Sequence, residues 1–167
     1  MMHRSHNIEG DCVFCKIVSG EITTPGVFWE NEKYMAFLSI FPNTKGFSVV
    51  IPKKHWASDV MALPDNELQQ FILAAKTVSQ ILTNYFDDVG RVGVIMEGMG
   101  VDHAHIKLMP MHGTEYLKRG EWKVCSSETK YFEKYDGFLC SNDGPKADED
   151  EIKKLAEGLK EIAELTT

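Results

Sequence analysis

Apolar residues between positions 64 and 85 recur three and four residues apart, the spacing that gathers side chains on one face of a helix. Pro64 and Asp65 are typical of a helix start, and the DDVG sequence after Tyr85 is typical of a helix end. The pattern therefore predicts an amphipathic helix over 64–85. Its apolar face would consist of Leu68, Phe71, Ile72, Ala75, Val78, Leu82 and Tyr85.

A second helical pattern covers 148–165, and acidic residues enrich its first turn. Its apolar stripe is formed by Ile152, Leu155, Leu159 and Ile162. We expect this C-terminal helix either to cap a sheet or to support a dimer. Near the other end of the chain, CVFCKIVSG at 12–20 predicts a short helix or turn that Gly20 ends.

Runs rich in β-branched and aromatic residues predict strands between these helices. The runs 27–30 and 34–40 flank a polar turn and predict a hairpin, and 47–52 predicts a strand that Pro52 stops. A further strand runs from 91 into a glycine-containing loop, and the next covers 103–110. These elements predict an α+β domain with an antiparallel sheet.

The strand HAHIKLMP at 103–110 has an unusual polar face. Side chains alternate along a strand, so His103, His105 and Lys107 point one way while Ala104, Ile106 and Leu108 point towards a core. Two imidazoles and an ammonium form a donor-rich patch suited to an anion, and histidine is also suited to nucleophilic chemistry. His55, at a strand exit, would join them. The alternative is an ordinary solvated strand face.

Composition limits the function classes. The 167 residues suit one compact domain, with 43% apolar and 26% charged residues. A net charge of −7 argues against binding a nucleic acid polymer, although a local pocket for one small phosphate is compatible with it. The sequence has no apolar run long enough to span a membrane and no signal-peptide core at its start, which predicts a cytoplasmic protein without membrane partners.

The four cysteines, at 12, 15, 125 and 140, do not suggest a disulfide framework in a chain without a secretion signal. Cys12 and Cys15 form a C-x-x-C, which is either half of a zinc site or a redox pair. No thioredoxin-like βαβ pattern surrounds it, which favours zinc. Cys125 and Cys140 lack such spacing and are interpreted as structural or free thiols.

Four motifs in order resemble those of the histidine-triad (HIT) family of nucleotide hydrolases and transferases. They are CVFC at 12–15, AFLSIFP at 36–42, SVVIPKKH at 48–55 and HAHIKLM at 103–109. The resemblance implies an α+β fold with an antiparallel meander of about five strands, one long helix and a C-terminal helix, usually doubled across a homodimer. On this basis, 11–115 is the HIT domain, 1–10 a flexible N-terminus and 116–167 an extension.

The resemblance also implies a mechanism. The middle triad histidine, here His105, attacks the α-phosphate of a nucleotide and forms a nucleotidyl-histidine that water or another acceptor removes. Lys107 would lower the pKa of His105, which keeps the imidazole neutral, and would hold a phosphate oxygen. His103, the third catalytic candidate, orients the strand in the family.

In zinc-containing members of the family, two cysteines and two histidines hold a structural zinc ion. The corresponding residues are Cys12, Cys15, His55 and His103. An alternative for His55 is a role beside the nucleophile, as in members without zinc. We expect a structural rather than a catalytic Zn²⁺.

The chain departs from the family pattern at three places. Lys107 stands at the third triad histidine, Ser39 replaces the acid that grips the ribose hydroxyls, and the loop before the triad lacks the usual Gly-Gln-Ser/Thr segment. Asp102 would replace part of that segment, fix a histidine tautomer, or be a solvated turn acid. The residues expected to bind a nucleotide are Leu38, Ser39, Ile40, Gly98, Gly100, Asp102 and Lys107.

The resulting prediction is a phosphohydrolase or nucleotidyl transferase acting on a nucleoside phosphoramidate, a dinucleoside polyphosphate or a similar α-phosphate ester. One alternative is a nucleotide-binding HIT protein with little or no catalysis, and another is a zinc-stabilised interaction module. Lys118 and Arg119 would suit an extended phosphate chain if 112–122 folded over the site; otherwise that segment is a solvated loop.

Overall fold

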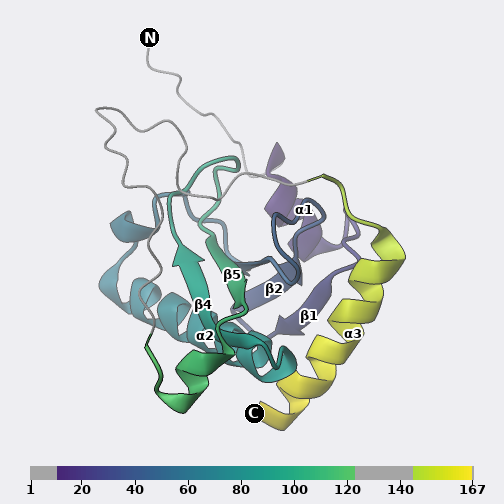
Figure 1. Ribbon diagram of the computed structural model, residues 1–167. Helices are drawn as coiled ribbons and strands as arrows, with labels where there is room; N and C mark the ends of the chain where they lie inside the picture. The colour runs from purple at the N-terminus through teal and green to yellow at the C-terminus, as the bar shows by residue number, and fades with distance from the viewer. Residues whose placement is uncertain (1–10, 123–144, 167) are drawn as a thin grey trace, which may run out of the picture.

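The computed structural model describes residues 11–122 and 145–166. Its elements are α1 (Val13–Ser19), β1 (Val27–Glu30), β2 (Tyr34–Leu38), β3 (Ser48–Pro52), η2 (Val60–Ala62), α2 (Asp65–Tyr85), β4 (Val89–Ile95), β5 (Ile106–His112), η3 (Glu115–Arg119) and α3 (Glu149–Thr166). The strands form one antiparallel sheet in the order β1-β2-β3-β5-β4 (Figure 1). The predicted α+β class is therefore confirmed. The predicted flexible segment 1–10 and the thiols Cys125 and Cys140 lie outside the described residues.

Helices cover both faces of the sheet, which explains why every residue of β2 is buried. Tyr34, Ala36 and Leu38 face the main core, which α2 and α3 complete. Met35 and Phe37 face the opposite way, into a smaller cluster with apolar residues of α1. The alternation of strand side chains thus supplies two cores from one strand.

The long helix buries one stripe of its surface against the sheet. Its buried residues are Phe71, Ala74, Ala75, Val78, Ile81 and Leu82. The sequence pattern was wrong about Ile72, which is 40% exposed, because the stripe passes through Ala74 and Ile81 and leaves Ile72 on the side turned away from the core. No helix in 11–122 or 145–166 has the length and apolar content needed to cross a membrane.

The C-terminal helix belongs to the same core as the sheet. In α3, Ile152, Ala156, Leu159 and Ala163 are buried in the main cluster, and the helix packs against α2, β1 and β2 (Figure 1). Segment 145–166 therefore caps the sheet, which was one of the two roles expected for it.

The basic residues of η3 lie away from the triad. The ammonium group of Lys118 donates to the carbonyls of Thr83, Phe86 and Asp87 at 3.1, 3.1 and 3.2 Å, where it closes the end of α2. Arg119 pairs with Glu121. Neither cation is in the lining of the pocket that contains His105, so the structure gives no support to the suggestion that they meet a phosphate chain there.

Candidate active site and metal cluster

The triad residues lie at the start of β5, on the face of the sheet that α1 covers. The strand begins at Ile106 rather than at 103, because Ala104 N donates to the Trp56 carbonyl at 2.8 Å and not to a neighbouring strand. The predicted alternation still holds, since Ala104, Ile106 and Leu108 are buried in the main core. Lys107 pairs in register with Val49 of β3, whose side chain lies in the α1 cluster.

Both histidines are buried, which excludes the solvated strand face. His103 is 0% and His105 is 2% exposed. Phe14 of α1 lies over them, with its ring centroid 5.7 Å from each imidazole centroid. The sequence pattern did not reveal this cover, because it depends on a helix ninety residues away along the chain.

His105 is held as a neutral imidazole with a defined tautomer. Its Nδ1 lies 2.7 Å from the backbone carbonyl of His103, which only accepts, so Nδ1 carries the proton and Nε2 keeps its lone pair. Burial lowers the pKa of His105, the carbonyls of His103 and Met99 and the charge of Glu97 oppose that shift, and the charge of Lys107 adds to it. The expected effect of Lys107 has the right sign, but burial is the larger cause.

His105 lines a pocket of about 590 Å³, a volume within the range of small-molecule sites. The walls come from α1 and the segment after it, the end of β2, the 97–101 loop and the first turn of α3. Five of the residues expected to bind a nucleotide line this pocket: Leu38, Ser39, Ile40, Gly100 and Lys107.

The other two expected residues, Gly98 and Asp102, are not among its lining. Gly98 has φ +69°, and a Cβ there would lie 2.7 Å from the Ser58 carbonyl oxygen. The Asp102 carboxylate accepts from Ser58 N at 3.0 Å. Both residues thus attach the 97–102 loop to the segment that follows β3.

Lys107 forms an ion pair with Glu97 in the pocket wall, and their side chains are 15% and 9% exposed. Glu97 was missed from the sequence, where only the glycines of the EGMG loop drew attention. The register of the sheet explains the pair, because β4 and β5 are antiparallel and Ile95 is opposite Lys107. A residue two positions beyond Ile95 therefore lies near the Lys107 side chain.

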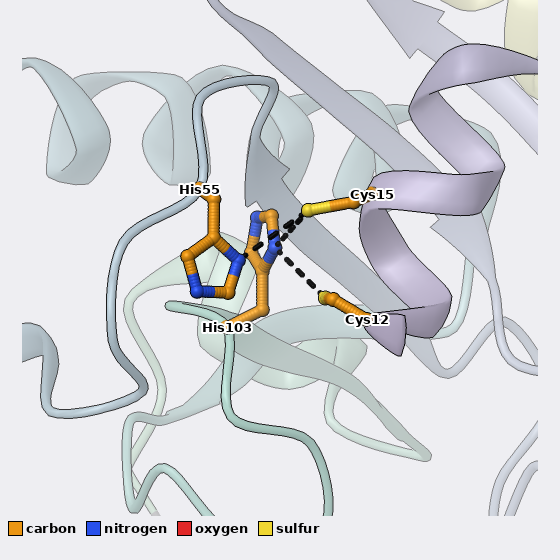
Figure 2. Close-up of side chains that lie close together, drawn as sticks. All are labelled: Cys12, Cys15, His55 and His103. Atoms are coloured by element: carbon orange, nitrogen blue, oxygen red, sulfur yellow. Dashed lines mark hydrogen bonds between the residues drawn. The ribbon is translucent and has the colours of Figure 1, made fainter. Parts of the chain in front are cut away.

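The four residues expected to bind zinc converge on one point (Figure 2). The Cys12 and Cys15 sulfurs lie 3.4 and 3.5 Å from His103 Nδ1, and Cys15 Sγ lies 3.3 Å from His55 Nδ1. Tetrahedral zinc with ordinary Zn–S and Zn–N bonds places its sulfur and nitrogen ligands about 3.5 Å apart. The separations fit a Cys₂His₂ zinc site.

The protonation of His103 also suits a metal ligand. Its Nε2 lies 2.8 Å from the Pro52 carbonyl oxygen and donates to it, so Nδ1 directs a lone pair at the two sulfurs. Burial is the main reason that the pKa of His103 is lowered to about 4, and the imidazole is therefore neutral at pH 7. His55, from the segment after β3, is grouped with the metal-binding candidates rather than with the pocket lining.

Known proteins resemble this chain in sequence and in fold. A HIT-like protein of Methanocaldococcus jannaschii, described as uncharacterized, is 37% identical over 121 residues, covering 67% of this chain and 89% of the relative. The adenosine 5'-monophosphoramidase hnt1 of Schizosaccharomyces pombe is 33% identical over 109 residues, covering 63% and 77%. A crystal structure of a Zn-bound histidine triad family protein from Mycobacterium smegmatis superposes with a TM-score of 0.64 at 18% identity, covering 95% and 96% of the two chains. The HIT domain profile matches residues 20–114. This chain belongs to the HIT family.

Proposed function

We propose that this protein hydrolyses nucleoside phosphoramidates or related nucleotides at the α-phosphate, or transfers the nucleotide, through a covalent nucleotidyl-histidine on His105. The observation that carries the proposal is the bond from His105 Nδ1–H to the His103 carbonyl, 2.7 Å away, in a residue that lines a nucleotide-sized pocket. The bond fixes the tautomer and leaves Nε2 as the nucleophile, and burial lowers the pKa of His105 so that the imidazole is neutral.

The reaction has two balanced steps. In the first, His105 Nε2 bonds to the α-phosphorus while the bond from phosphorus to the leaving nitrogen breaks, and the departing amine takes up a proton from solvent or from the Lys107 ammonium. In the second, a water oxygen bonds to phosphorus, the phosphorus–imidazole bond breaks, and the proton of the water passes to solvent or back to Lys107, whichever gave its proton in the first step. The His103 carbonyl holds the positive imidazolium ring that exists between the two steps.

Lys107 has a second role in this mechanism. Its side chain is in the wall beside His105 and offers N–H donors to a non-bridging phosphate oxygen as charge builds there. Since Glu97 shares the same ammonium group, a bound phosphate competes with Glu97 for its donors.

We assign Cys12, Cys15, His55 and His103 to a structural zinc ion, with His55 a ligand rather than a neighbour of the nucleophile. Bound zinc would join α1 to the loop after β3 and to the start of β5, which holds Phe14 over His105. The Zn-bound relative with the same fold supports this assignment.

Relatives named adenosine 5'-monophosphoramidase support the choice of a phosphoramidate as the leading substrate class. The resemblance to the family also leads us to propose a homodimer in the cytoplasm. Light scattering after gel filtration would measure the mass of the particle in solution and so test the homodimer. Strand β4 is an outer strand of the sheet and offers a pairing edge for such a dimer.

The decisive experiment compares the wild type with His105→Ala on adenosine 5'-phosphoramidate. We expect the variant to lose at least about a thousandfold in rate, and a nucleotide adduct to be found by mass spectrometry on the wild type alone. His112→Ala is the matched control, since His112 lies at the far end of the same strand and bonds to Asp88 and the Lys45 carbonyl. Equal rates for the wild type and His105→Ala would reject the proposal.

A second candidate function is nucleotide binding without turnover, and the Lys107–Glu97 pair favours it because the ammonium is already engaged. That function predicts thermal stabilisation by AMP or GMP without release of an amine from any phosphoramidate.

A further inference from the structure

The pocket wall at the end of β2 provides no carboxylate. Ser39 follows Leu38 there and lines the pocket together with Ile40. The Ser39 hydroxyl oxygen already accepts from Phe41 N at 3.1 Å. A neutral serine bonds weakly to a sugar hydroxyl in comparison with an ionised acid.

The residues that lead into α3 lie against this stretch of chain. Ala147 N donates to the Ile40 carbonyl at 2.9 Å, one residue beyond Ser39. The Asp148 carboxylate accepts from Asp150 N at 2.9 Å and from Glu151 N at 3.1 Å, which caps the helix. These bonds fix the position of the turn beside the pocket.

Glu149 is the residue of this turn that lines the same pocket as Ser39 and His105. Its neighbour Asp150 is not among the lining residues and pairs instead with Lys153 at 3.5 Å. The Glu149 carboxylate bonds to Lys146 at 3.3 Å, with both side chains 57% exposed. Exposed pairs of this kind contribute little free energy, so a ligand group can displace the lysine at small cost.

We propose that Glu149 binds the ribose hydroxyls of the nucleotide and so replaces, from the C-terminal helix, the carboxylate that Ser39 does not supply. The inference rests on the proposed function, because it places the α-phosphate at His105 and Lys107. A ribose has two adjacent hydroxyl donors, and one carboxylate accepts from both with charge-assisted bonds. The pocket therefore selects ribonucleotides through a residue outside the matched segment 20–114.

Calorimetry on the full chain with AMP and with 2′,3′-dideoxy-AMP tests this assignment, since neither ligand requires turnover. The wild type should bind AMP about tenfold more tightly than the dideoxy compound, as expected for the loss of a charge-assisted hydrogen bond. Glu149→Gln should lose that preference and bind dideoxy-AMP as the wild type does. Asp150→Asn, with the same charge change one residue away, should keep the preference.

Restoring an acid on β2 provides the sharpest control. Ser39→Asp placed in the Glu149→Gln background should recover the preference for AMP, which a merely structural role of Glu149 would not produce. Equal binding of both ligands by the wild type, no AMP binding at all, or a preference retained in Glu149→Gln would each overturn the assignment. The proposed function is judged separately, by whether the wild type and not His105→Ala releases the amine from a phosphoramidate.

Discussion

The ammonium of Lys107 and the carboxylate of Glu97 form a largely buried ion pair in the pocket that contains His105. The pair joins β5 to the loop that follows β4, and it brings two opposite charges to a place where the family pattern has a histidine. Removing one partner leaves the other charge poorly solvated and without a counter-charge. This lowers the free energy of unfolding more than replacing both residues by apolar ones would.

Glu97→Gln should therefore lower the free energy of unfolding by about 3 kcal/mol, measured by urea denaturation. Glu30→Gln, which breaks the more exposed Lys53–Glu30 pair, should cost less than about 1 kcal/mol. Without Glu97 the Lys107 ammonium has lost its counter-charge and should bind the phosphate of AMP more tightly. AMP should therefore raise the melting temperature of Glu97→Gln more than that of the wild type. Equal shifts would mean that Lys107 does not contact the phosphate.

Zinc removal should make α1 open more often. We expect one zinc ion per chain in protein purified without added metal, and a chelator or Cys12→Ser should increase amide exchange in α1 and lower the melting temperature. Lys16→Ala, a change on the same helix that keeps both cysteines, should retain the metal. Metal-free wild-type protein with full α1 protection would contradict the zinc assignment.

Gly158→Ala should destabilise the protein, although alanine is the better helix former by up to about 1 kcal/mol. A Cβ at this position would lie 2.6 Å from Tyr85 Cε2, so either the Tyr85 ring or α3 must shift, and the ring is packed edge-on against Phe86. We expect a loss of about 1–3 kcal/mol in urea denaturation. Tyr85→Ala in the same background should make the alanine far less harmful. A stabilised Gly158→Ala single variant would contradict this prediction and show that the Tyr85 ring moves aside at little cost.

Stability at acid pH should depend on Asp88. Burial opposes the shift, but the hydrogen bond and the charge of His112 lower the pKa of Asp88 below its ordinary 3.8. A lowered folded-state pKa stabilises the protein above the unfolded value, and that contribution disappears as the pH falls through the folded pKa. Wild type and Asp88→Asn should therefore differ in melting temperature at pH 6, and the difference should shrink as the pH falls below 3.8 and disappear below the folded-state pKa of Asp88. A difference in melting temperature that does not shrink as the pH falls below 3.8 would contradict this account.

Much of the fold was predictable because its signals are local. The hairpin of β1 and β2, the end of α1 at Gly20 with φ +79°, and the bounds of α2 follow from turn residues and periodicity within a few positions. The convergence of Cys12, Cys15, His55 and His103 was also expected, but from the family resemblance rather than from spacing.

What the sequence did not reveal depends on packing between distant segments. Phe14 from α1 covers His103 and His105, and Glu97 from the loop after β4 forms the ion pair with Lys107. Glu149 was read only as a helix-start acid, because no local pattern indicates that the turn lies beside Ser39. Register and helix docking decide these contacts.

The pocket draws its walls from both flanks of the matched segment, since Phe14 precedes residue 20 and Glu149 follows residue 114. On the proposed mechanism, the reacting residue His105 lies inside the matched segment, whereas α1 and α3, which lie outside it, would contact the rest of the substrate. Changes in α1 and α3 would then alter the substrate preference and leave His105 and its bond to the His103 carbonyl intact.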